Sequence, residues 1–223
     1  MASHLDLEEQ EQLDELKHFW KRWGDLITWV LIAVFGSYAA WMGWQSWSAK
    51  QSAQSAALYD TVERAALSAD MALLDRSVAD IKDKFASTSY AQQAALLAAR
   101  IYQDKARPAD ARKQLAWVID TSGDEGYRAL ARLRLSALLI EEKNFDAARQ
   151  QLSTKVPVSF EPLLADRLGD IDLLENKTAQ AIKNYQTAWK GFDANAEYRR
   201  LVAVKLAALG ADPEDTAAKE ATK

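Results

Sequence analysis

The stretch RLRLSALLIEEKNFDAARQQL (residues 132–152) recurs in altered form as DRLGDIDLLENKTAQAIKNY (166–185), at a shift of 33 residues. An earlier copy, LAARIYQDKARPADARKQL (97–115), fits at a shift of 37 residues. Small residues allow two helices to cross closely, and a bulky residue fills the space between successive hairpins. The spacing therefore predicts stacked helix hairpins. Each copy has a small residue, an alanine twelve positions later and a bulky residue four positions after that: Ala99, Ala111 and Leu115; Ser136, Ala148 and Leu152; Gly169, Ala181 and Tyr185.

The composition after Lys50 agrees with an all-helical domain. Ala, Leu, Gln, Arg and Lys dominate, all of them good helix formers, and the whole chain has only eight Gly and four Pro. Apolar residues do not alternate with a period of two for long, so no sheet is expected. Breaks between short antiparallel helices are predicted near residues 68–70, 86–89, 105–108, 121–124, 142–144, 156–162, 175–177 and 192–195.

The three copies resemble the tetratricopeptide repeat, a helix hairpin of about 34 residues. The resemblance is degenerate, because Ala165 stands where the repeat usually has a tryptophan and the closing proline is missing. It implies an α-solenoid of antiparallel hairpins. Residues 55–67 and 71–85 would form an atypical first hairpin, and residues 196–209 a final helix that covers the last one. Residues 210–223 contain no aromatic or large aliphatic side chain and are predicted to be disordered.

An apolar run, DLITWVLIAVFGSYAAWMGWQSW (25–47), precedes the repeats. No charged residue lies between Asp25 and Lys50, and the 19 residues from Leu26 to Trp44 would span roughly 28 Å as a helix. A bilayer core is about 30 Å thick. Tryptophans favour the headgroup layer and here spare the centre of the run. The run therefore predicts a transmembrane helix. Six of the eight tryptophans flank or lie within it: Trp20, Trp23, Trp29, Trp41, Trp44 and Trp47.

Two other interpretations of this run are weaker. A cleaved signal peptide would use Ser37-Tyr38-Ala39 as its cleavage site, but the preceding segment is long and acidic and the tryptophan pattern continues past it. A helix lying on the membrane surface needs a charged face, which the run lacks. Orientation follows from Lys and Arg counts near the span. Lys17, Lys21 and Arg22 precede it, so the N-terminus is expected to be cytoplasmic.

The span divides the chain into four predicted regions: a cytoplasmic segment (1–24), the transmembrane helix (25–47), an exported repeat domain (48–209) and a tail (210–223). Residues 1–25 carry seven acidic and three basic side chains, a net charge of -4. The whole chain is also -4, so the remainder is near neutral. The acidic segment is expected to be a solvated tail, with a docking site for a basic cytoplasmic partner as the alternative.

Known catalytic arrangements are not indicated by the sequence. The chain has no cysteine, and His4 and His18 both precede the span. No phosphate-binding glycine motif is present. Acidic pairs such as Asp170 and Asp172 point to different faces of a helix. We therefore expect no enzyme, cofactor or metal site, and the lack of a basic stripe argues against nucleic acid as a partner.

Binding surfaces remain as the expected functional sites. First helices of stacked hairpins tend to line the concave side, where apolar and charged residues suit an extended peptide or a partner helix; the alternative is that the apolar ones are core. These predicted partner-binding residues are Gln93, Leu96, Arg100, Leu133, Ala137, Ile140, Asp166, Asp170 and Leu173. A stripe of small residues in the span would allow a second transmembrane helix to approach; its members are Ala33, Gly36, Ser37, Ala40 and Gly43.

The whole layout resembles the YfgM-like family of ancillary subunits of the SecYEG translocon. The resemblance covers roughly residues 13–209. It rests on LKHFWKRWGDLITWVLIAVFGSYAAWMGWQSW, on AKQSAQSAALYDTVERA, and on degenerate hairpins containing YAQQAALLAARIYQDKARPADARKQLAWVI and LADRLGDIDLLENKTAQAIKNYQTA.

The resemblance implies a single-span inner-membrane protein with a periplasmic domain, in contact with membrane lipid. It also implies work beside the translocon with a membrane-anchored periplasmic chaperone of the prolyl-isomerase type, close to emerging secretory polypeptides. Two other functions stay open. One is a scaffold in envelope assembly or cell division, and the other is a regulator of envelope stress signalling through the acidic tail.

Overall fold

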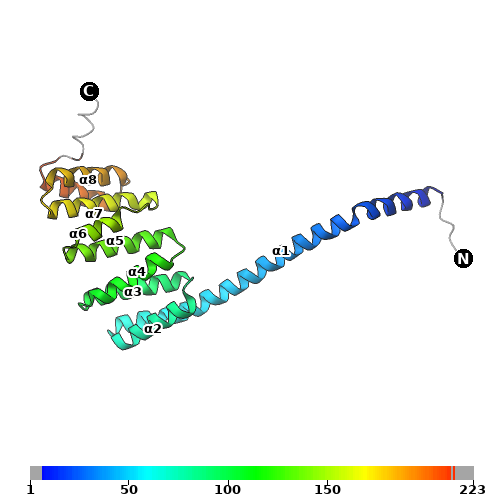
Figure 1. The fold of residues 1–223 in the computed structure, drawn as a ribbon, viewed down its shortest axis with the longest axis horizontal. Coiled ribbons are helices and arrows are strands. Elements are labelled where there is room, and N and C mark those ends of the chain that lie inside the picture. Colours follow the sequence, from blue (N-terminus) through cyan, green and yellow to red (C-terminus); the bar gives the residue numbers. More distant parts are fainter. Residues whose placement is uncertain (1–6, 212, 214–223) are drawn as a thin grey trace, which may run out of the picture. The chain divides into compact units, whose positions relative to one another are not determined.

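The computed structural model describes residues 7–211 and 213, and in this part the chain forms helices joined by short turns (Figure 1). The predicted all-α fold is confirmed. The predicted disordered tail lies outside the described residues except for Gly210, Ala211 and Pro213. The helices are α1 (Leu7–Leu67), α2 (Met71–Phe85), α3 (Ser89–Asp104), α4 (Pro108–Thr121), α5 (Glu125–Glu141), α6 (Phe145–Leu152), the 3-10 helix η1 (Val158–Phe160), α7 (Glu161–Leu174), α8 (Thr178–Gly191) and α9 (Glu197–Ala208).

Two compact units make up the chain, residues 1–53 and 54–223. The predicted boundary between residues 47 and 48 falls inside α1, which runs without a break to Leu67. The last residues of α1, 54–67, belong to the second unit, where they serve as the first helix of the first hairpin.

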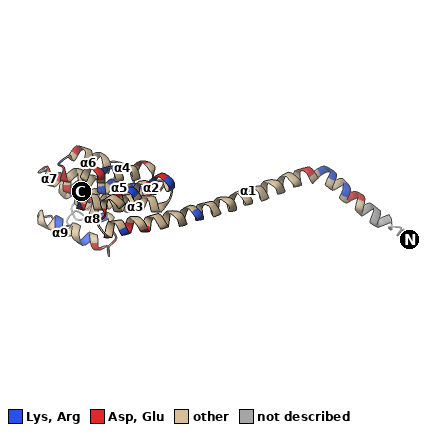
Figure 2. Ribbon diagram, turned by 90° about the horizontal axis from the view of Figure 1, so that it is seen from below, with Lys and Arg blue, Asp and Glu red and all other residues tan. Residues whose placement is uncertain are grey.

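In the first unit, α1 contains a stretch long and apolar enough to cross a membrane, as predicted from the sequence. Figure 2 shows a long uncharged section of α1 with Lys, Arg, Asp and Glu on either side of it. Most of the large apolar side chains of this section are exposed, as lipid contact requires. The hydroxyls of Thr28 and Ser37 donate to the carbonyls of Gly24 and Ala33, at 2.8 and 2.7 Å, so the helix satisfies its own polar groups.

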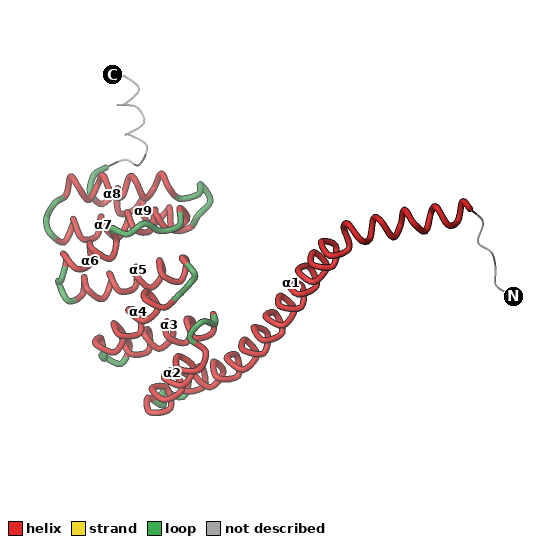
Figure 3. Tube along the Cα trace, turned by 45° about the vertical axis from the view of Figure 1, so that its right-hand side comes forward, coloured by secondary structure: helices red, strands yellow, loops and turns green. Residues whose placement is uncertain are grey.

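The second unit is a stack of helix hairpins, α1/α2, α3/α4, α5/α6 and α7/α8, followed by α9 (Figure 3). Within each hairpin, the first helix ends in the same turn. Ala69, Ala106, Lys143 and Asn176 have positive φ angles of 54°, 56°, 60° and 62°. The N–H of the next residue then donates to the carbonyl five residues before it, as from Arg107 to Tyr102 at 2.7 Å. This is the Schellman ending of a helix, and its recurrence marks four equivalent hairpins.

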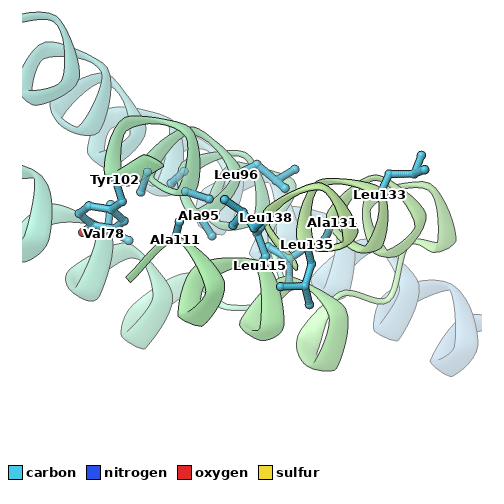
Figure 4. Packing of buried hydrophobic residues seen from close by; sticks show 14 of the residues in the cluster. Val78, Ala95, Leu96, Tyr102, Ala111, Leu115, Ala131, Leu133, Leu135 and Leu138 are labelled. Carbon is cyan, nitrogen blue, oxygen red and sulfur yellow. The ribbon is translucent and has the colours of Figure 1, made fainter. Parts of the chain in front are cut away.

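The core of the stack is formed by the small and bulky residues that the repeat predicted. Ala111, Leu115, Ser136, Ala148 and Leu152 are all at most 3 % exposed. Figure 4 shows Ala111 and Leu115 gathered with Ala95, Leu135 and Leu138 of the neighbouring first helices. The two helices of the last hairpin approach closely. A Cβ added at Gly169 would stand 2.6 Å from the ring of Tyr185, which is itself buried.

The left-handed turns give a direct test of the repeat's turn geometry. Ala106 is exposed at φ 56°, a conformation that costs a non-glycine residue roughly 1–2 kcal/mol. We expect Ala106→Gly to raise the free energy of unfolding by about 1 kcal/mol. The control Ala79→Gly, at an exposed position inside α2, is expected to lower it by a similar amount. Denaturant unfolding of the full-length protein in detergent measures the free energy of unfolding of both variants. A lower value for Ala106→Gly than for the parent would contradict the left-handed conformation at residue 106.

Candidate interaction surfaces

The first helices of the hairpins, which are residues 54–67 of α1 and helices α3, α5 and α7, form one surface of the second unit, and α9 extends this surface beyond α7. We call it the first-helix face. Side chains join α3 to α5 along it: Gln93 donates to the hydroxyl of Tyr127 at 2.8 Å, and Arg134 to the carbonyl of Leu96 at 3.1 Å. Gln103 extends the same contact to Glu141 at 3.1 Å. The first-helix face is therefore continuous from α3 to α5.

Two neighbouring hollows open on the first-helix face. The first, of about 330 Å³, lies between the end of α1 and α3. The second, of about 210 Å³, lies between α3 and α5, with Leu115 of α4 also contributing. Arg100 borders both. The first hollow is lined by Glu63, Ala66, Leu67, Leu97, Arg100, Ile101 and Asp104, and the second by Ala99, Arg100, Gln103, Leu115 and Arg134.

The predicted partner-binding residues do not form one open site. Leu96, Leu133 and Asp166 are buried, at 5 %, 9 % and 1 % exposure, so these three are part of the interior. Leu96 and Leu133 belong to the main hydrophobic core. Arg100 and Leu173 are exposed. The rest are partly buried: Gln93, Ala137, Ile140 and Asp170.

The residues that line the first hollow were missed from the sequence, apart from Arg100. Leu97, Ile101 and Asp104 follow one another at spacings of four and three on α3, which is the spacing of one helix face. That signal was present in the sequence. The sequence did not show that the end of α1, with Leu67, forms the other wall of this hollow.

Asp166 and Asp170 are held inside the last part of the stack. Lys205 of α9 donates to both carboxylates of this pair, at 2.8 Å to Asp166 and 2.7 Å to Asp170. The hydroxyls of Tyr198 and Tyr185 donate to Asp166 and Asp170 at 2.9 and 2.8 Å. Burial, and then the charge of Asp166, raise the pKa of Tyr198 to about 12. These contacts tie α9 to α7 and α8, and they occupy two of the residues predicted to bind a partner.

A second buried carboxylate, Asp172, joins three helices. Arg149 of α6 donates to one of its oxygens and Asn184 of α8 to the other, each at 2.6 Å. Arg149 also pairs with Glu175. Both carboxylate oxygens of Asp172 therefore accept a hydrogen bond. Such hydrogen bonds are needed to offset the cost of removing a carboxylate from water. This cluster is structural.

The span offers the other candidate surface. A Cβ added at Gly36 or Gly43 would meet no atom within 4 Å, so nothing in the described chain covers the small-residue stripe. At 100° per residue, Leu31, Phe35, Tyr38 and Met42 lie on the opposite side of the helix. One side of the span can thus admit a close helix while the other presents bulky side chains to lipid.

Chemistry beyond binding is not indicated by the geometry. Among the side chains that the structure describes, residues 13–211 and 213, no group of three or more His, Cys, Asp or Glu is placed to hold a metal ion. The two buried carboxylates, Asp166 and Asp172, are paired with Lys205 and Arg149 from other helices.

Removal of Lys205 tests the structural role of the Asp166 and Asp170 pair. Lys205→Met leaves a carboxylate that is 1 % exposed without its cation, and we expect a loss of about 3 kcal/mol in the free energy of unfolding. The control Lys113→Met removes an exposed lysine that pairs with Asp110 at the surface. It should change the free energy of unfolding by less than about 0.5 kcal/mol. Equal effects of the two substitutions in denaturant titrations would show that α9 does not depend on this contact.

Comparison with known proteins agrees with the fold. The family model described as "Tetratricopeptide repeat-like domain" matches residues 17–211. A protein of Neisseria gonorrhoeae named "Ancillary SecYEG translocon subunit" is 33 % identical over 210 residues, covering 94 % of this chain and all of the relative. A Haemophilus influenzae protein of the same name is 28 % identical over 182 residues, covering 82 % of this chain and 89 % of the relative. No solved structure matches the chain significantly. The chain belongs to the YfgM-like family of tetratricopeptide repeat-like proteins.

Proposed function

We propose that this protein is a non-enzymatic, membrane-anchored ancillary subunit of the SecYEG translocon. The observation that carries the proposal is the pairing, in one chain, of an apolar span with an uncovered small-residue stripe and a stack of helix hairpins. The names of the relatives from Neisseria gonorrhoeae and Haemophilus influenzae support it, and the likeness to the first, over 210 residues, extends over both parts.

In the proposed arrangement, the N-terminal segment lies in the cytoplasm and the hairpin stack lies in the periplasm. Lys17, Lys21 and Arg22 precede the span closely, whereas only Lys50 and Arg64 stand comparably close after it. Positively charged residues remain on the cytoplasmic side during insertion. The repeat domain would then face polypeptides as they leave the translocon.

The two candidate surfaces have different roles in this proposal. The small-residue stripe packs against a transmembrane helix of the translocon, where close approach of backbones provides the contact. The first-helix face holds a periplasmic partner, either a membrane-anchored chaperone of the prolyl-isomerase type or the emerging chain. Tethering to the translocon raises the effective concentration of that partner, so a weak interaction suffices.

Bulky substitutions in the stripe provide the test. We expect Gly36→Leu/Gly43→Leu to lose most of its copurification with translocon subunits from a mild detergent, because the added side chains hold the partner helix away. Phe35→Leu/Met42→Leu, on the opposite side of the same helix, is expected to copurify as the parent does. The measurement is the ratio of translocon subunits to tagged protein at equal expression.

Photocrosslinkers at the same positions identify the partner. Residues 36 and 43 should give adducts with translocon subunits, and residues 35 and 42 adducts with lipid. Equal loss in both pairs of substitutions, or adducts with a division or outer-membrane assembly complex in place of the translocon, would refute the proposal.

A further inference from the structure

Arg100 and Arg134 form an unneutralised pair of cations on the first-helix face. Both border the hollow between α3 and α5. Over the described residues, no carboxylate lies within the 4.0 Å of an ion pair from either guanidinium. Partial burial, and then the like charge of Arg100, lower the pKa of Arg134 from its ordinary value. Two cations that repel one another across a hollow leave a place for an anion.

Two other arginines that lie between helices of the stack are paired with carboxylates. Arg107 pairs with Asp75 and Asp110, and Arg149 with Asp172 and Glu175. One N–H of Arg134 donates to the carbonyl of Leu96, and the side chain also lines the hollow. Guanidinium groups bind carboxylates through two parallel hydrogen bonds, so the expected ligand is a carboxylate.

The neighbouring hollow is suited to an apolar side chain. Its walls include Ala66, Leu67, Leu97 and Ile101, and Leu67 is 87 % exposed, so its side chain is accessible to a ligand. Arg100 borders this hollow as well as the cationic one. A single ligand can therefore fill both, provided that its apolar group and its carboxylate lie close together.

We propose that the two hollows bind an extended, unfolded peptide segment that carries a large apolar side chain and, two residues away, an aspartate or glutamate. In an extended chain, residues two apart point to the same side, roughly 6.6 Å from one another. The apolar side chain enters the hollow at Leu67, Leu97 and Ile101, and the acidic side chain is held between Arg100 and Arg134.

An acidic side chain within the segment, rather than a C-terminal carboxylate, is favoured by what lies beyond the two hollows. The first-helix face continues past Arg134 along α5, where Gln103 and Glu141 make a hydrogen bond beside it. The opposite edge carries Glu63 and Asp104, which would repel a second acidic residue. The inference rests on the proposed function, for it gives the chemical class of polypeptide that the first-helix face would bind.

The test uses the full-length protein in detergent micelles and labelled synthetic peptides of ten residues. The main probe carries Leu-Ala-Asp in a glycine and serine background, with a blocked N-terminus and an amidated C-terminus. One comparison probe replaces the aspartate by asparagine. Another keeps the asparagine and has a free C-terminal carboxylate directly after it. Fluorescence anisotropy at fixed ionic strength gives the Kd of each.

We expect the Kd of the aspartate probe to be lower than that of the asparagine probe by a factor of about ten or more. A charge-assisted hydrogen bond is strong enough to produce this difference. Arg100→Gln/Arg134→Gln should remove that advantage. Arg76→Gln/Lys113→Gln removes the same charge from α2 and α4, away from the first-helix face, and should keep it. Because Arg134 also supports the carbonyl of Leu96, Arg100→Gln alone is the second variant, expected to weaken binding at an unchanged melting temperature.

Leu67→Ser tests the apolar hollow independently of the two arginines. It should weaken the leucine-containing probe and leave a probe with alanine in place of leucine unaffected. Equal binding of the aspartate and asparagine probes, equal loss in the control variant, or preference for the probe with the free C-terminus would each overturn the proposal. The peptide assay contains no translocon. A negative result in it therefore bears on the peptide site alone, and the copurification experiment tests separately whether the small-residue stripe binds the translocon.

Discussion

The close crossing of the two helices within each hairpin is the constraint on which the rest of the structure depends. At the last hairpin, the ring of Tyr185 lies against the backbone of Gly169, and no side chain fits between them. The equivalent positions Ser136 and Leu152 are both buried. This crossing leaves the first helices side by side, and the recurring left-handed turn at the end of each one returns the chain at the same angle. The first-helix face is the surface that results.

The first-helix face is not uniform along the stack. Toward α9, carboxylates and their cations are matched and buried, as in the contacts of Asp166 with Lys205 and Tyr198. That end acts as a cap, which a stack of hairpins needs where its last apolar surface would meet water. Toward α1, the cations Arg100 and Arg134 have no acidic partner and the surface has hollows. A partner is therefore expected at the α1 end, which is also the end that continues into the span.

The fold was predictable because its signals are local or periodic. The spacings of twelve and four residues between the small residue, the alanine and the bulky residue of each copy predicted the hairpins. An uncharged run with tryptophans toward its ends predicted the span. The partner-binding residues were less predictable. Asp166 has the appearance of a surface residue in the sequence, and it is buried because Lys205, 39 residues later, neutralises it. Leu96 and Leu97 are identical in type and adjacent, yet only the second lines a hollow, since one residue turns a helix by 100°.

Substitution of Gly169 by alanine, in the full-length protein, tests the crossing most directly. The new Cβ would stand 2.6 Å from a buried ring, so we expect a loss of about 1–3 kcal/mol in the free energy of unfolding. Gly169→Ala/Tyr185→Leu, which removes the ring, should recover part of that loss. Alanine is otherwise the better helix former by about 1 kcal/mol. A stability equal to or above that of the parent would therefore contradict the close crossing of α7 and α8.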